Sequence, residues 1–178
     1  MIIALAGRRI DPPEAKETRF PLRNIDKVRT GIRALLKEKA ATALVSSAAC
    51  GADLIALSEA GQLGLRRRVI LPFERGRFRE TSVTDRPGDW GTLYDEILDA
   101  VEAKGDVIVL QNVSDEQAYS AANRAILDDA VAFTTTGHEP AAAVLVWDGT
   151  SRGDHDLTEE FGVEARRRGL VVAEIRTI

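Results

Sequence analysis

The chain has 178 residues, a length that fits one ordinary domain with a sizeable hydrophobic core. Hydrophobic residues make up 44% of it and charged residues 29%, a composition that excludes collagen-like and disordered proteins. Lys and Arg number 24 against 28 Asp and Glu, so the net charge is −4 and no chain-wide basic field points to nucleic acid.

Six short apolar runs along the chain predict β-strands. Most are rich in β-branched residues and lack the alternation of a half-exposed strand, a pattern typical of strands covered on both faces. The predicted strands span residues 2–6, 43–46, 68–72, 106–110, 142–147 and 170–175.

Amphipathic stretches between these runs predict helices, because apolar residues recur there at helical spacing. They include residues 28–36, 54–63, 93–101 and 126–133. Strands that alternate with helices form βαβ units with right-handed crossovers. We therefore predict one α/β domain over residues 1–178, with a Rossmann-like, open, mostly parallel sheet of five to six strands and helices on both faces.

Polar residues mark several expected boundaries. Ser114 with Gln117, and Asp156 with Glu159, form capping-box patterns that predict helix starts. The arginines at 66–68 are interpreted as the end of a helix, where positive charge suits the helix dipole. Residues 11–21 are predicted to form a long surface loop, and loops of that length are usually functional or mobile.

Candidate ligand-binding residues follow the first two predicted strands, where open parallel sheets form their crevice. Arg8, after Gly7, can bind a phosphate with its fork of donors. Ser47 and Gly51 let a ligand approach the backbone, next to a helix start with free N–H groups. Asp53 can accept hydrogen bonds from ribose hydroxyls. The alternative is that Gly51 only makes a turn and Asp53 only favours the helix start.

Further candidates follow the later strands. Arg75 and Arg77 add positive charge for an anionic ligand. Tyr119 and Asn123 share one helix face, where the tyrosine ring can stack on a base or sugar and the amide can read its edge. A hydrogen bond from Asn123 to a neighbouring loop is the structural alternative. The far wall of the crevice is assigned to Asp148 and Gly149.

Three strings of residues resemble the SLOG superfamily. They are Gly-Arg-Arg at 7–9, Val-Ser-Ser-Ala-Ala-Cys-Gly-Ala-Asp-Leu at 45–54 and Ile-Leu-Pro-Phe at 70–73. This superfamily joins the Smf/DprA DNA-processing proteins, the LOG phosphoribohydrolases and stand-alone Rossmann-like domains that sense nucleotides. The later pieces at 78–83, 119–124 and 146–149 resemble an uncharacterised bacterial branch. The resemblance implies a sensor or binding domain for a nucleotide or nucleotide derivative.

The same resemblance leaves two other functions open. LOG enzymes carry a PGGxGTxxE motif that binds phosphoribose and supplies the catalytic carboxylate. Residues 87–96 here read Pro-Gly-Asp-Trp-Gly-Thr-Leu-Tyr-Asp-Glu, which makes Asp95 or Glu96 the candidate catalytic residue of an N-glycosidic hydrolase of nucleoside monophosphates. The string also fits a helix start covered by Trp90. DNA handling in the manner of Smf/DprA is disfavoured by the acidic balance.

Other motifs and partners are expected to be absent. GxGxxG and P-loop fingerprints are missing, no Cys/His spacing predicts a metal site, and we expect no cofactor. Cys50, the single cysteine, has no nearby histidine and is interpreted as a buried filler. No apolar run approaches the ~18 residues of a membrane span. We expect a cytoplasmic protein whose partner is a small molecule rather than nucleic acid or membrane, with a homo-oligomer left open.

Overall fold

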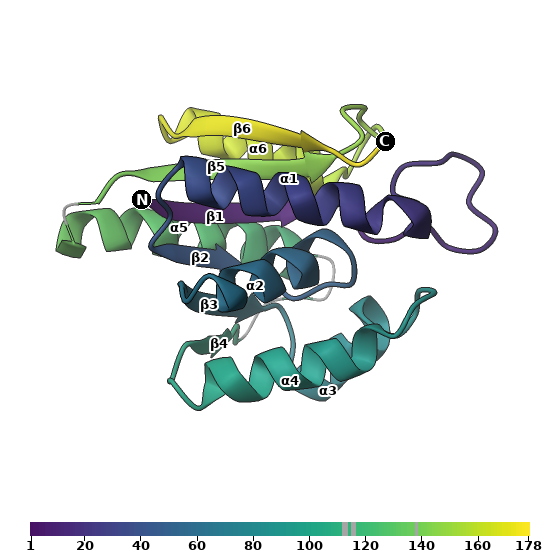
Figure 1. Ribbon diagram of the computed structural model, residues 1–178, viewed down its shortest axis with the longest axis horizontal. Helices are drawn as coiled ribbons and strands as arrows, with labels where there is room; N and C mark the ends of the chain where they lie inside the picture. The colour runs from purple at the N-terminus through teal and green to yellow at the C-terminus, as the bar shows by residue number, and fades with distance from the viewer. Residues whose placement is uncertain (112–113, 115–116, 138) are drawn as a thin grey trace.

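The computed structural model describes residues 1–111, 114, 117–137 and 139–178. Within these residues, six parallel strands form one open sheet in the order β4-β3-β2-β1-β5-β6 (Figure 1). The strands are β1 (Ile2–Gly7), β2 (Ala43–Ser46), β3 (Arg66–Leu71), β4 (Val107–Val109), β5 (Ala141–Trp147) and β6 (Val171–Arg176). Each lies where an apolar run predicts it, so the predicted fold class is confirmed.

Helices cover both faces of this sheet. They are the 3-10 turn η1 (Leu22–Asn24), α1 (Ile25–Glu38), α2 (Ala52–Gln62), α3 (Arg75–Ser82), α4 (Trp90–Glu102), α5 (Ala118–Gly137) and α6 (Leu157–Arg167). In Figure 1, α1 and α2 lie in front of the sheet, and α5 and α6 lie behind it. None of the helices in the described residues combines the length and apolarity needed to cross a membrane.

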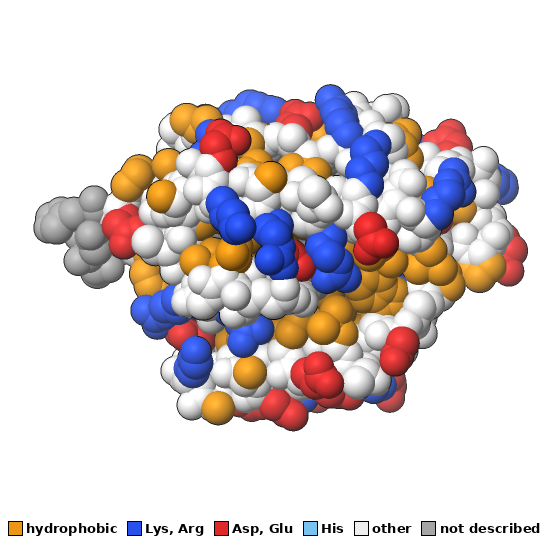
Figure 2. Space-filling model, in the orientation of Figure 1, with side chains coloured by type: hydrophobic (Ala, Val, Ile, Leu, Met, Phe, Trp, Pro, Cys, Tyr) orange, Lys and Arg blue, Asp and Glu red, His pale blue; other side chains and the backbone are white. Residues whose placement is uncertain are grey.

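Two apolar cores, one on each face, explain why the strands read as continuous apolar runs. Along β1, Ile3 and Leu5 pack into the core beneath α1 and α2, whereas Ile2 and Ala4 pack into the core beneath α5 and α6. Successive side chains of a strand point to opposite faces, so a sheet covered on both sides needs apolar residues at every position. Figure 2 shows the α1 and α2 face, with a recess floored by hydrophobic side chains toward the side of the loop between β1 and α1.

Two of the predicted helix boundaries are wrong and one is confirmed. Helix α5 begins at Ala118, so Ser114 is not its N-cap. The arginines at 66–68 open β3 instead of closing a helix, because α2 already ends at Gln62. Asp156 caps α6 as predicted, since its side chain accepts hydrogen bonds from the backbone N–H groups of Thr158 and Glu159.

The strand order reverses at β1. This strand pairs with β2 on one side and with β5 on the other, and both neighbours are parallel to it. In open α/β sheets, such a reversal leaves a crevice beyond the carboxyl ends of the strands. The strand order therefore predicts a crevice after Gly7, between the ends of β1 and β5.

Candidate ligand cavity

A cavity of about 660 Å³ occupies this crevice. Its walls come from the end of β1, the loop that follows it, the start of α2, the end of α3, the first half of α5 and the start of α6. The volume lies within the range of pockets that hold small molecules and cofactors. Residues far apart in the sequence thus meet in one site.

Cationic side chains outnumber acidic ones in the lining. The cationic set is Arg8, Arg9, Lys16, Arg19, Arg86 and Arg152, and the acidic set is Asp11, Glu17 and Asp53. A concave site lined mostly by one sign of charge concentrates ligands of the opposite sign. Most of these arginines are paired with carboxylates, and Arg152, whose nearest carboxylate contact is 3.7 Å, is the one best placed to meet an anionic ligand.

The Arg8 guanidinium is held by carboxylates of the protein itself. Its Nε donates to Asp148 Oδ1 at 2.8 Å, and its Nη1 and Nη2 donate to the two oxygens of Asp156 at 2.6 and 2.8 Å. Nη2 also donates to the backbone oxygen of Thr150 at 2.7 Å. The Arg8 side chain is only 2% exposed. Arg8 therefore lines the cavity but fastens the end of β1 to the start of α6.

The two carboxylates around Arg8 also hold other arginines. Arg19 donates from Nη1 to Asp148 Oδ2 at 2.7 Å. Burial by itself would raise the pKa of Asp156, but hydrogen bonds from Arg8 and from the Arg152 and Glu159 backbone N–H groups lower it to about 2. Both acids thus act as anionic anchors for the basic side of the cavity.

Among the described residues, the Arg152 guanidinium has the fewest protein partners on the basic side of the cavity. Its nearest carboxylate contact joins Nε to Asp156 Oδ2 at 3.7 Å, and no hydrogen bond involves its Nη atoms in the described part of the chain. Burial lowers the pKa of Arg152, and the neighbouring charge of Arg8 lowers it further. Half of the side chain is exposed. Its donors are therefore available to a ligand.

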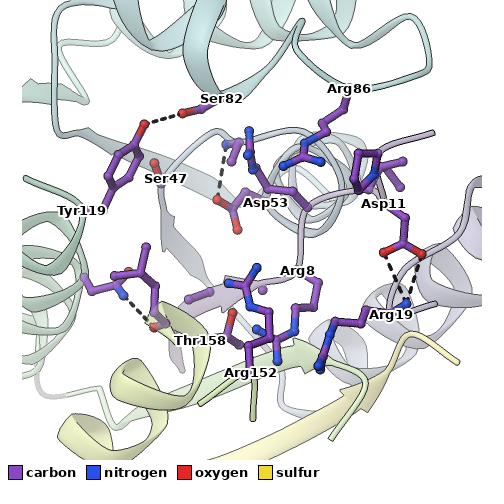
Figure 3. Close-up of a pocket in the computed structure, with 18 of the residues that line it drawn as sticks. Arg8, Asp11, Arg19, Ser47, Asp53, Ser82, Arg86, Tyr119, Arg152 and Thr158 are labelled. Atoms are coloured by element: carbon purple, nitrogen blue, oxygen red, sulfur yellow. Dashed lines mark hydrogen bonds between the residues drawn. The ribbon is translucent and has the colours of Figure 1, made fainter. Parts of the chain in front are cut away.

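Asp53 lies on the opposite side of the cavity from this basic group (Figure 3). Oδ2 accepts from the Ala49 backbone N–H at 3.3 Å, whereas Oδ1 is buried without a hydrogen-bond partner. The residue is 7% exposed. Burial raises the pKa of Asp53 to about 7, against smaller opposing effects of the Ala49 hydrogen bond, the Ser46 side chain and the charge of Arg9. The Ser46 hydroxyl itself donates to the Leu5 backbone oxygen at 3.0 Å. A buried carboxyl oxygen without a partner costs folding free energy, so a hydrogen-bond donor that reached it would stabilise the folded chain.

Backbone hydrogen bonds occupy N–H groups at the start of α2. The Ala52 N–H donates to the Arg8 oxygen at 3.1 Å, and the Cys50 N–H donates to the Ser82 oxygen at 3.0 Å. Gly51 has φ +93°, and a Cβ there would lie 2.8 Å from the Arg8 oxygen. Glycine is thus required by close packing against the β1 end. Cys50 is fully buried, which raises the pKa of its thiol to about 11 and argues against a nucleophile.

Helix α5 contributes the wall with Tyr119 and Asn123. The Tyr119 hydroxyl lies 2.8 Å from Ser82 Oγ, and its ring makes an edge-to-face contact with Phe73 at 5.5 Å between centroids. Asn123 Nδ2 donates to the Leu157 backbone oxygen at 2.8 Å, so its amide is anchored to the start of α6. Ala122 and Ile126 add apolar surface beside them. This wall suits a flat, apolar group such as a base.

The structure brings six of the sequence-predicted site residues into the cavity lining and leaves the others outside it. Inside are Gly7, Arg8, Ser47, Asp53, Tyr119 and Asn123. Gly51 and Asp148 support the lining through Arg8, as described above. The side chain of Arg176 occupies the space in which a Cβ at Gly149 would lie.

Four candidates from α3 and α4 face elsewhere. Arg75 contacts Asp95, Asp99 and Glu102 of α4, and the Arg77 guanidinium lies over the Phe73 ring. Asp95 also holds Arg79 at 2.9 Å. The remaining carboxylate is Glu96, which lies on the same helix. The string 87–96 thus forms the start of a surface helix, in which Trp90 is 5% exposed.

Sequence reasoning missed two basic residues of the lining. Arg19 lies near the end of the long loop that follows β1, and Arg152 lies in the loop that follows β5, both after strand ends where a ligand is expected. Among the described residues, no group of three or more His, Cys, Asp and Glu side chains is arranged to hold a metal ion. Comparison of the chain with protein-family models and with curated proteins gave no match.

Proposed function

We propose that this chain binds a nucleotide or nucleotide derivative in the cavity at the strand ends, as a sensor or binding domain. The observation that carries the proposal is the basic cavity at the reversal of strand order, with Arg152 donors available on one side and an apolar wall on α5. Phosphate groups are recognised by arginine donors, and bases by aromatic and apolar surfaces. The SLOG resemblance of residues 45–54 points to the same ligand class.

Calorimetric titration tests the proposal directly. The probes are the common ribonucleoside 5′-monophosphates and 5′-diphosphates, ADP-ribose, the free nucleosides and inorganic phosphate. We expect at least one nucleotide to bind more tightly than both its nucleoside and inorganic phosphate, because the basic side and the apolar wall then act together. Absence of binding by every nucleotide probe would overturn the proposal. Mass spectrometry of the denatured protein identifies any nucleotide that co-purifies.

A matched pair of variants locates the binding site. Arg152→Gln removes a cation from the cavity, whereas Arg166→Gln removes one of similar exposure from the outer surface of α6, where it pairs with Glu174. We expect Arg152→Gln to weaken nucleotide binding by about tenfold, the value of one charge-assisted hydrogen bond, and Arg166→Gln to leave it unchanged. Equal effects of the two variants would mean that binding responds to overall charge and not to this cavity.

The phosphoribohydrolase function receives no support from the positions of Asp95 and Glu96. Both lie outside the cavity lining, and Asp95 is engaged by Arg75 and Arg79. For this reason the proposal is limited to binding.

A further inference from the structure

We propose that the cavity recognises a phosphorylated ribose at two points, with the phosphate against Arg152 and Arg19 and the ribose 2′-hydroxyl donating to Asp53, so that ribonucleotides bind in preference to 2′-deoxyribonucleotides. This inference rests on the proposed function and deepens it. It assigns an orientation to the ligand and a chemical basis for selecting it.

The first observation is the separation of charge within the cavity. Figure 3 shows Arg8, Arg19 and Arg152 on one side, and Asp53, Ser47, Ser82 and Tyr119 on the other, together with Arg86, which lies 3.4 Å from the Asp85 carboxylate. Both Nη atoms of Arg19 already donate to oxygens of the protein, Nη1 to Asp148 and Thr150 and Nη2 to Glu17, so Arg19 adds positive charge and Arg152 supplies the free donors. An anion placed against Asp53 would meet a buried carboxyl, whereas one placed against Arg152 meets free donors. The phosphate end of a ligand therefore belongs on the arginine side.

The second observation excludes the start of α2 as the phosphate site. In many nucleotide-binding sheets the first glycine-rich turn presents free N–H groups to a phosphate. Here the N–H groups of Ala49, Cys50 and Ala52 donate to Asp53, Ser82 and Arg8. Gly51 packs so closely on the β1 end that no atom fits between them. These N–H groups of the turn are thus occupied by internal hydrogen bonds. We therefore assign the phosphate to the arginine side of the cavity.

The third observation is the unpartnered oxygen of Asp53. The side chain is more than nine-tenths buried, belongs to the cavity lining, and leaves Oδ1 without a hydrogen-bond donor. A carboxylate accepts hydrogen bonds and repels phosphate, so its complement is a hydroxyl or an amine. Of the groups on a nucleotide, the ribose hydroxyls lie between phosphate and base. With phosphate on the arginine side and base on the α5 wall, the sugar is the part that faces Asp53.

Paired titrations test this orientation. Each of AMP, GMP, CMP and UMP is compared with its 2′-deoxy counterpart by calorimetry on the intact chain at pH 8, where the Asp53 carboxyl is ionised. We expect the ribonucleotide that binds to be favoured over its 2′-deoxy form by at least about tenfold, the value of a hydrogen bond to a charged group. Equal affinities within a bound pair would overturn the two-point recognition but leave the proposed function standing. Absence of binding by all eight probes would overturn both.

Variants at the two points separate their contributions. In Asp53→Ala, the preference for ribose should disappear, so that the two forms bind with about equal affinity. The affinity for the 2′-deoxy form should be unchanged. Asp53→Asn keeps an oxygen for the Ala49 N–H and removes the charge, so it should retain an intermediate preference. Asp53→Asn also tests the role of Asp53 if Asp53→Ala does not fold. In Arg152→Gln, both members of the pair should weaken equally. A ribose preference that persists in both Asp53 variants would assign the discrimination to another residue and overturn the role of Asp53.

Discussion

Two groups of arginines lie at opposite ends of the sheet and differ in what holds them. At the amino end, Arg66 donates to both oxygens of Asp106, and Arg68 lies 3.0 Å from Asp129. Both guanidinium groups also lie over the Phe133 ring. At the carboxyl end, Arg152 keeps its Nη donors beside a cavity. The comparison teaches that free donors next to an open volume, more than the number of arginines, distinguish a binding group from a structural one.

The largest expected effect comes from Arg8, which is structural although it lies at the cavity end. Arg8→Met would leave Asp148 and Asp156 buried without their main partner, so we expect a loss of about 3–5 kcal/mol in the free energy of unfolding. Urea denaturation measures it. Arg166→Met serves as control, since its exposed ion pair is worth about 1 kcal/mol or less. Similar losses in the two variants would contradict the structural role of Arg8.

Two substitutions test the difference between the two groups of arginines most directly. Arg68→Gln removes a partner of Asp129, so we expect a loss of about 1 kcal/mol, a fall of about 2–4 °C in Tm, with nucleotide affinity unchanged. Arg152→Gln should show the reverse, with Tm unchanged and affinity lowered about tenfold. Thermal unfolding and calorimetry on the same samples measure the two effects. A stability loss in Arg152→Gln equal to that in Arg68→Gln would remove the distinction between the two groups.

The pH dependence of stability sharpens the comparison between Asp53 and Asp156. Below pH about 3.8, Asp53 is protonated in both the folded and the unfolded chain. Between that value and about 7, the unfolded chain releases the proton while the folded chain keeps it, so stability from this group falls as pH rises. The groups that act on Asp53 are Arg9, the Ala49 N–H and Ser46. Asp156 behaves oppositely: its contribution is present above about 3.8 and is lost as pH falls through about 2.

Asp53→Asn isolates the first of these contributions. We expect the variant to gain stability relative to the original chain between pH 4 and pH 7, and to keep a constant advantage above that. Unfolding free energies measured across this range check the sign. A difference independent of pH would show that Asp53 ionises normally in the folded chain.

The smallest effect is expected at Asp95. Its carboxylate is 42% exposed and pairs with a half-exposed Arg79, so Asp95→Asn should change stability by less than about 1 kcal/mol. Nucleotide affinity should stay unchanged, because Asp95 lies outside the cavity lining. Chromatography of a nucleoside monophosphate incubated with each protein is the decisive measurement. Release of free base that disappears in Asp95→Asn would establish the hydrolase function instead.

The fold was largely predictable because burial on both faces leaves a local signal. Each residue of β1 from 2 to 6 faces one of two cores, so the run reads as apolar without any tertiary information. The first half of β3 lacks this signal, since it consists of arginines whose partners Asp106 and Asp129 lie about 40 and 60 residues further along. Such pairs cannot be seen locally, which is why the arginine run reads as a helix end.

The site was predictable where its residues follow a strand closely or share a helix face, as Tyr119 and Asn123 do on α5. Gly7, Ser47 and Asp53 lie within a few residues of β1 and β2, and the rule for strand ends finds them. Arg75 satisfies the same rule, but the turn of α3 directs it toward α4. Arg152 reaches the cavity through the Asp156 anchor at the start of α6, a relation that depends on how the helix packs.

The carboxylate of Asp11 closes the base of the loop that forms one wall of the cavity. It accepts from the Arg19 N–H at 3.0 Å and from the Phe20 N–H at 3.0 Å, and the Asp11 N–H donates to the Phe20 oxygen at 2.9 Å. The residues between form a closed loop whose inner side lines the cavity. Opening of this base would uncover the cavity. Hydrogen exchange at the Arg19 and Phe20 amides reports that rate, and a ligand held beneath the loop slows it.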